Sequence, residues 1–133
     1  MVIAGSLRSA KLVRKPWGHE RWLVPETSSF AFKRIRLKAG MRTSLQLHRQ
    51  KEEAALILSG KGTLVWRRDR EGPMQSVSLM AGAVVHVLPN TVHRIVAETD
   101  LTLIEVSTPE LDDVIRIADD SGRPDGKIES EHA

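Results

Sequence analysis

Residues 40–60 decide the fold, and they read GMRTSLQLHRQKEEAALILSG. Glycine bounds the stretch at both ends, and Gln46, His48 and Glu53 follow one another at short intervals between the two glycines. Alternate side chains of a strand face opposite sides, so a strand at Ser44–His48 presents Gln46 and His48 on the same face. Two groups that can bind a metal ion or form hydrogen bonds therefore point the same way.

The same alternation singles out two residues elsewhere in the chain. In a strand over Val92–Ala97, His93 shares its face with apolar side chains, where a polar group needs a partner. In a strand over Phe30–Leu37, Lys33 falls on the face that also carries Ile35. We therefore expect His93 and Lys33 to point into the protein.

Length and composition narrow the class of protein. The chain has 133 residues, which suffices for one packed domain and is too short for two. With 41% hydrophobic and 28% charged residues, neither a disordered chain nor a fibrous repeat fits. The longest apolar runs are far below the roughly 18–20 residues that cross a bilayer, so we expect no membrane span.

Charge and cysteine content exclude further classes. Lys and Arg total 20 against 17 Asp and Glu, a mild excess that does not indicate a nucleic-acid-binding protein. Cysteine is absent, which rules out disulfides, thiolate zinc sites and cysteine nucleophiles. The N-terminal segment lacks the apolar core of a secretory signal, so we expect a cytoplasmic protein, with organelle targeting as the alternative.

Turn residues recur about every 8–12 residues between short stretches rich in Val, Ile, Leu, Trp and Thr, which is typical of an antiparallel barrel or sandwich. The best helical segment is Gln50–Leu58, of which we expect the second half to be strand. We divide the chain into an N-terminal arm (1–13), a barrel (14–123) and a flexible polar tail (124–133).

The glycines and the ligand-type residues resemble the cupin superfamily. Gly40, Gln46, His48, Glu53 and Gly60 have the spacing of its first motif, with glutamine at the usual place of the first histidine. The second motif is similar to the segment from Gly82 to His93, although Ala97 occupies its usual asparagine position. The resemblance implies an all-β, single-domain cupin fold, which is a double-stranded β-helix or jelly-roll barrel. It also implies one divalent ion bound by Gln46, His48, Glu53 and His93, with Zn first and Mn, Fe, Ni or Co as alternatives.

Within that superfamily the chain resembles the type II mannose-6-phosphate isomerase domain, which is also the C-terminal part of mannose-1-phosphate guanylyltransferases. The resemblance covers roughly residues 14–123 and is carried by the segments Lys15–Gly18, Phe32–Ile35, Ser44–His48, Leu103–Val106, Leu111–Arg116 and 119–123. It implies interconversion of an aldose phosphate and a ketose phosphate, such as mannose 6-phosphate and fructose 6-phosphate. The chain departs from that family at Lys51, where arginine is usual, and at Ala54-Ala55, where His-Trp is usual.

The isomerase interpretation assigns roles to several residues. Lys33 would donate to the developing oxyanion, and Glu53 is one candidate for the base. Trp17 would stack on the sugar, and the phosphate would be bound by Arg42, Lys51 and Arg123. Arg94 has the wrong strand parity for this role.

Two other classes of function remain open: a metal- and sugar-binding module without turnover, and a small iron-dependent dioxygenase. The altered segment around Lys51 favours the first, and glutamine as a ligand argues against the second. As partners we expect a phosphorylated hexose, no nucleic acid and no membrane. We also expect a homodimer that covers an exposed sheet edge.

Overall fold

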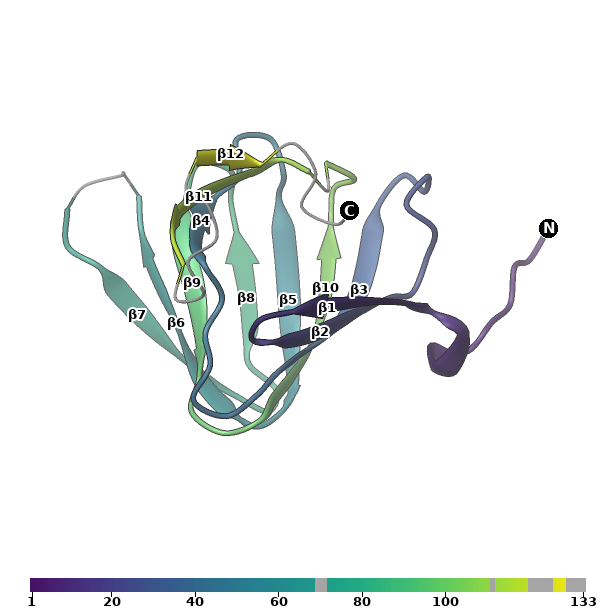
Figure 1. Cartoon of the computed structure of the whole chain (residues 1–133), viewed down its shortest axis with the longest axis horizontal. Coiled ribbons are helices and arrows are strands. Elements are labelled where there is room, and N and C mark those ends of the chain that lie inside the picture. The colour runs from purple at the N-terminus through teal and green to yellow at the C-terminus, as the bar shows by residue number, and fades with distance from the viewer. Residues whose placement is uncertain (69–71, 111, 120–125, 129–133) are drawn as a thin grey trace.

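The computed structural model describes residues 1–68, 72–110, 112–119 and 126–128. Its strands form two antiparallel sheets that pack face to face (Figure 1). Sheet A contains, in spatial order, β1 (Lys11–Lys15), β2 (Gly18–Trp22), β3 (Ala31–Leu37), β10 (Leu101–Ser107), β5 (Glu53–Ser59) and β8 (Val84–Val87). Sheet B contains β12 (Gly126–Ile128), β11 (Val114–Ala118), β4 (Leu45–Leu47), β9 (Val92–Ala97), β6 (Lys61–Arg67) and β7 (Gln75–Met80).

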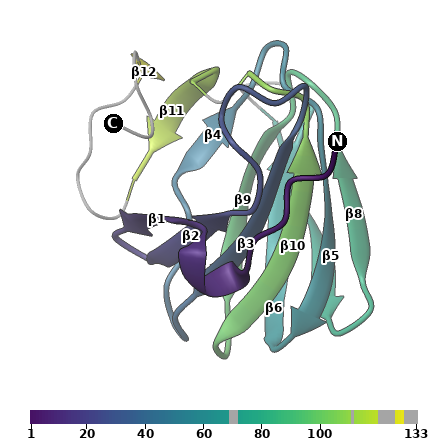
Figure 2. The ribbon, with the colours of Figure 1, turned by 90° about the vertical axis from the view of Figure 1, so that its right-hand side faces the viewer.

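Successive strands alternate between the two sheets from β3 to β6 and again from β7 to β11. This alternation wraps the chain around a common interior, and Figure 2 shows sheet A from its outer side, with β3, β10, β5 and β8 toward the viewer. The arrangement is the jelly-roll barrel that the turn rhythm and the cupin resemblance predicted, so the all-β, single-domain prediction is confirmed.

The interior of the barrel is filled by alternate side chains of strands such as β3 and β5. In β3 the odd-numbered residues are buried and the even-numbered residues are half-buried or exposed, and β5 alternates in the same way from Glu53 to Ile57. The main core gathers inward-facing residues of both sheets, with Leu37, Ile57 and Leu103 among the most buried. A smaller cluster of Leu47, Val92 and Ile115 fixes β4 between β9 and β11.

Three segments differ from the sequence-based expectation. Residues 50–52 are irregular, so helix in the first half of Gln50–Leu58 is wrong, whereas the strand expected in the second half is present as β5. β1 begins at Lys11, inside the predicted arm, because it pairs with β2 along its whole length. In the predicted flexible tail, Gly126–Ile128 form β12, which pairs with β11.

A 3-10 helix, η1 (Leu7–Ser9), precedes β1, and it is the single helix among the residues that the structure describes. No helix in those residues is long and apolar enough to cross a membrane.

Candidate metal centre

A cavity lies between the two sheets and collects most of the buried polar side chains. Its volume is about 80 Å³, compared with the roughly 10–15 Å³ needed by one water molecule. Sheet A, β4, β9 and the loops next to them supply its polar wall, which consists of Lys15, Glu20, Thr43, Ser44, Gln46, His48, Lys51, Glu53, His93 and Glu105. The space suffices for an ion and part of a small ligand.

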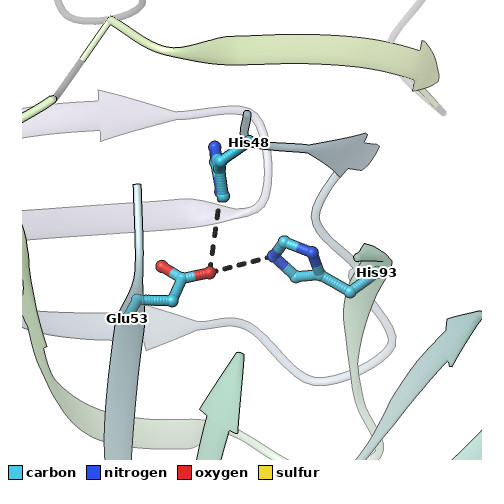
Figure 3. Close-up of side chains that lie close together, drawn as sticks. All are labelled: His48, Glu53 and His93. Atoms are coloured by element: carbon cyan, nitrogen blue, oxygen red, sulfur yellow. Dashed lines mark ion pairs between the residues drawn. The ribbon is translucent and has the colours of Figure 1, made fainter. Parts of the chain in front are cut away.

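Three of these residues converge closely. His48 follows β4, Glu53 begins β5 and His93 lies in β9, so the cluster joins sheet B to sheet A. The Nε2 atom of His93 lies 3.0 Å from Oε1 of Glu53, and Nε2 of His48 lies 3.6 Å from the same oxygen (Figure 3). All three side chains are buried, and their ligand atoms lie within 4.8 Å of one another. The His48–Glu53–His93 group can hold a metal ion.

The hydrogen bonds of the two imidazoles fix which nitrogen faces the carboxylate. Nδ1 of His48 lies 2.6 Å from the carbonyl oxygen of Asp113, and Nδ1 of His93 lies 2.9 Å from that of Thr91. A carbonyl oxygen only accepts, so each Nδ1 carries a proton, and Nε2 is the nitrogen that each ring directs at Glu53. Nε2 of His48 is buried without a hydrogen-bond partner among the described residues. Two imidazole nitrogens and a carboxylate oxygen directed at one point are a donor set that suits a divalent ion, so the residues fit such an ion.

Glu53 is kept ionised by its neighbours. Burial alone would raise its pKa, but the Lys51 ammonium holds the pKa well below its usual value. Nζ of Lys51 lies 3.4 Å from Oε2 of Glu53 and 3.7 Å from Oε2 of Glu105. Burial would lower the pKa of Lys51, but Glu105 and Glu53 together raise it. Lys51 is therefore a fixed cation beside the ligand cluster.

Glu105 is a second carboxyl group in the same wall, and the sequence analysis missed it. Burial and the neighbouring Glu53 charge raise its pKa to about 8, so at neutral pH it keeps a proton and hydrogen-bonds to Glu53. It lies in β10 opposite Lys33 of β3, a pairing that depends on strand register.

Asp113 organises the loop that carries Lys51. Its carboxylate accepts hydrogen bonds from the backbone N–H groups of Arg49, Gln50 and Lys51, at 3.3, 2.6 and 2.9 Å. Burial would raise the pKa of Asp113, but these bonds lower it. The carbonyl of the same residue orients His48, so Asp113 supports both a ligand and the loop beside it.

Lys33 points inward and is buried, but it reaches the cavity wall through another residue. Its Nζ lies 3.2 Å from Oε1 of Glu20 and 5.0 Å from the centre of a Trp22 ring. Nε1 of Trp22 donates to the same Glu20 oxygen at 3.0 Å. Glu20 itself lines the cavity and was missed, although its strand parity with the aromatic Trp22 marks it as inward-facing.

The remaining predicted site residues differ in whether they line the cavity. Gln46 lines the cavity and accepts a hydrogen bond from Oγ of Ser44 at 3.0 Å, and Trp17 also lines it from the turn between β1 and β2. Arg42 is exposed and lies outside this wall. Arg94 also lies outside it, but the side chain is buried rather than exposed, and its Nε donates to the Thr43 carbonyl. Arg123 falls outside the described residues.

The profile of one protein family matches most of the chain. The profile of a family described as Mannose-6-phosphate isomerase C-terminal matches residues 5–119. No curated protein has a sequence that matches this chain significantly.

Solved structures share the fold. CapF, a capsular polysaccharide assembling protein from Staphylococcus aureus, aligns with a TM-score of 0.72 and 18% identity over 83% of this chain and 34% of its own. Oxalate decarboxylase from Bacillus subtilis gives 0.71 and 18% over 85% and 31%. A proposed sugar phosphate isomerase from Acidithiobacillus ferrooxidans gives 0.53 and 26% over 64% and 53%. The chain thus spans about a third of the length of the first two proteins.

Proposed function

Since this chain belongs to the family of mannose-6-phosphate isomerase C-terminal domains and has the cupin fold, we propose that it is a metal-dependent isomerase of a phosphorylated hexose. The observation that carries the proposal is the buried His48–Glu53–His93 group, in which two imidazole nitrogens face one ionised carboxylate. Gln46 would complete the ligand set from the same wall of the cavity.

The ion would supply polarisation of the sugar carbonyl and its neighbouring hydroxyl, which is what aldose–ketose interconversion requires. In that reaction a proton leaves C2 and is delivered to C1, while a hydroxyl proton passes between the two oxygens, so no oxidant or reductant is needed. Glu53, Glu105 and Glu20 are the carboxyl groups of the cavity wall that can exchange these protons. Lys33 would act as a positioning residue, because its ammonium contacts Glu20.

Substrate binding would use the apolar and cationic parts of the same cavity. Trp17 presents an aromatic side chain to the cavity, where it can stack on a sugar face. Lys51 contacts the Glu53 carboxylate and the carboxyl group of Glu105, so these groups rather than a phosphate already hold its ammonium. For the phosphate we propose Lys15 of the cavity wall, together with Arg42, which is exposed outside that wall, and Arg123.

The test is metal content by mass spectrometry on protein purified without chelator or metal resin, followed by mannose 6-phosphate turnover on the same samples. His48→Ala and His93→Ala should lose both the metal and turnover. His86→Ala is the matched control, because His86 is exposed, contacts Glu52 and lies outside the cavity. It should keep both properties.

Other results would change the conclusion in defined ways. Metal in the wild type without turnover would contradict the isomerase proposal. If the sugar also stabilised the protein against heat, the result would indicate a non-catalytic metal- and sugar-binding module. This second candidate is favoured by the contacts of Lys51 with Glu53 and Glu105, which already engage its ammonium. Equal metal content in the wild type and in both site variants would contradict the metal centre.

A further inference from the structure

The outward face of sheet A carries a row of residues that changes from basic to apolar across the sheet. Direct cross-strand partners link Leu12 to Arg21, Arg21 to Arg34 and Arg34 to Ile104. The row continues from Ile104 to Leu56 and from Leu56 to Val84 at the edge strand β8. One row thus crosses all of sheet A: Leu12 on the edge strand β1 is followed by two arginines, and apolar side chains continue the row to β8.

A second row extends the basic end. Arg14 of β1 lies opposite His19 of β2, and His19 lies opposite Arg36 of β3. With Arg21 and Arg34, five basic side chains occupy neighbouring positions on three strands. Adjacent strands lie about 4.8 Å apart, so the cluster is about 10 Å wide. We call these residues, Arg14, His19, Arg21, Arg34 and Arg36, the basic cluster.

Like charges directly opposite one another in a sheet destabilise it, so this arrangement has a cost for folding. No ion pair joins the basic cluster to a carboxylate among the described residues. Nη2 of Arg34 instead contacts Nε2 of His19 at 3.1 Å, and Nε of Arg34 is buried without a hydrogen-bond partner there. Burial and the surrounding arginines lower the pKa of His19, which leaves its ring neutral as an acceptor for Arg34.

The apolar end of the face is exposed. Leu56, Leu58, Val84 and Val106 are each more than two-fifths exposed, and they lie on the neighbouring strands β5, β8 and β10. The N-terminal arm does not cover this face: it overlaps sheet A in Figure 2 but projects away from the barrel in Figure 1. An apolar surface of this kind, adjoining unneutralised arginines, is typical of a site for another molecule.

We propose that the outward face of sheet A binds a protein partner that presents carboxylates next to apolar side chains. Arginine forms bidentate pairs with carboxylates, and the apolar residues that continue the same row supply the part of the interface that excludes water. A polyanion such as nucleic acid or polyphosphate would satisfy the basic cluster but would leave Leu56, Val84 and Val106 exposed. A second copy in the same register would bring arginines against arginines.

The test uses a fluorescent synthetic peptide in which a run of glutamates precedes valines that alternate with serine. A second peptide has serine in place of valine. Binding to the full chain is measured by anisotropy at low and at physiological ionic strength. Inorganic polyphosphate and double-stranded DNA are compared at equal charge.

The protein variants separate charge from apolar contact. Arg14→Glu/Arg36→Glu reverses two exposed members of the basic cluster, and we expect about tenfold weaker binding of the valine peptide. Lys61→Glu/Arg68→Glu makes the same change in net charge at exposed residues outside sheet A and should change affinity less than about twofold. Leu56→Ser/Val84→Ser should weaken the valine peptide about fivefold and leave the serine peptide unchanged. Circular dichroism checks that each variant is folded.

Three results would overturn the proposal. The first is no binding of the valine peptide by wild-type protein at low ionic strength. The second is an equal loss of affinity in the two charge-reversal variants. The third is tighter binding of polyphosphate or DNA together with indifference to Leu56→Ser/Val84→Ser, which would make the face a polyanion site.

Discussion

Asp113 combines two contacts that usually come from separate residues. Its carbonyl orients His48, and its carboxylate holds the backbone of residues 49–51. The partner that orients a metal-binding histidine commonly influences affinity almost as strongly as the ligand itself.

Asp113→Asn should therefore weaken metal binding about tenfold and lower the free energy of unfolding by about 1–3 kcal/mol, because an amide accepts fewer of these hydrogen bonds. The measurements are a metal titration with a competing chelator and urea unfolding of the metal-free protein. Glu98→Gln, at an exposed carboxylate, is the control and should change neither quantity. An unchanged metal affinity in Asp113→Asn would show that the loop keeps its conformation without the carboxylate.

At the scale of single elements, the turn between β5 and β6 carries the chain from sheet A to sheet B at Gly60. Gly60 has a φ of 92°, and a Cβ atom there would lie 2.0 Å from the carbonyl oxygen of Asp100. Gly82 has nearly the same conformation, with a φ of 89°, but a Cβ atom there would meet nothing within 4 Å. The two glycines have similar backbone strain, but they differ in the space available for a side chain.

Gly82→Ala should cost about 1–2 kcal/mol of stability for the left-handed conformation alone. Gly60→Ala should cost more than about 3 kcal/mol, because the clash with Asp100 adds to that strain and a backbone segment must move. Urea unfolding measures both. Equal losses would mean that the turn at Asp100 shifts freely, and that the close approach of the two segments contributes little.

Strand alternation explains how much of the site was predictable. It placed Gln46 and His48 on one face and turned His93 and Lys33 inward, and the structure has all of them buried or lining the cavity. These are local properties of short segments. The jelly-roll fold was likewise predictable, because turn residues and motif spacing are also local.

The parts of the site that could not be predicted from the sequence depend on contacts between segments that are distant in the chain. Glu105 reaches the site because β10 pairs with both β3 and β5 in a particular register. Asp113 reaches residues 49–51 from more than sixty positions away. Helix was wrongly expected at residue 50 because periodicity gives no sign that a distant carboxylate holds this backbone in an irregular loop.

At the scale of the whole molecule, the barrel encloses a connected set of charges. Lys51 lies between Glu53 and Glu105, and Lys33 pairs with Glu20. Glu105 has an ordinary pKa of 4.5 and a pKa of about 8 in the folded protein. Between these values the folded protein holds a proton that the unfolded chain releases. The contribution of Glu105 to stability is therefore full below about pH 4.5 and is lost as the pH rises through about 8.

Glu105→Gln removes this proton linkage and keeps a donor toward Glu53. The metal-free variant should lose less stability than the wild type between about pH 5 and about pH 8, as measured by urea unfolding at several pH values. Glu98→Gln should follow the wild-type curve. Identical curves for all three proteins would show that Glu105 ionises as an exposed carboxyl group does.

The candidate metal centre would draw its ligands from both sheets: His48 and His93 belong to the side of sheet B, and Glu53 to sheet A. In a chain without cysteine, an ion at this point would be a reversible cross-link between the layers. Such a link adds about 2.7 kcal/mol when the free metal exceeds its dissociation constant a hundredfold, and nothing when metal is scarce. Resistance to proteolysis would then follow the metal supply, so that the abundance of the protein in a cell would itself report how much metal the cell has.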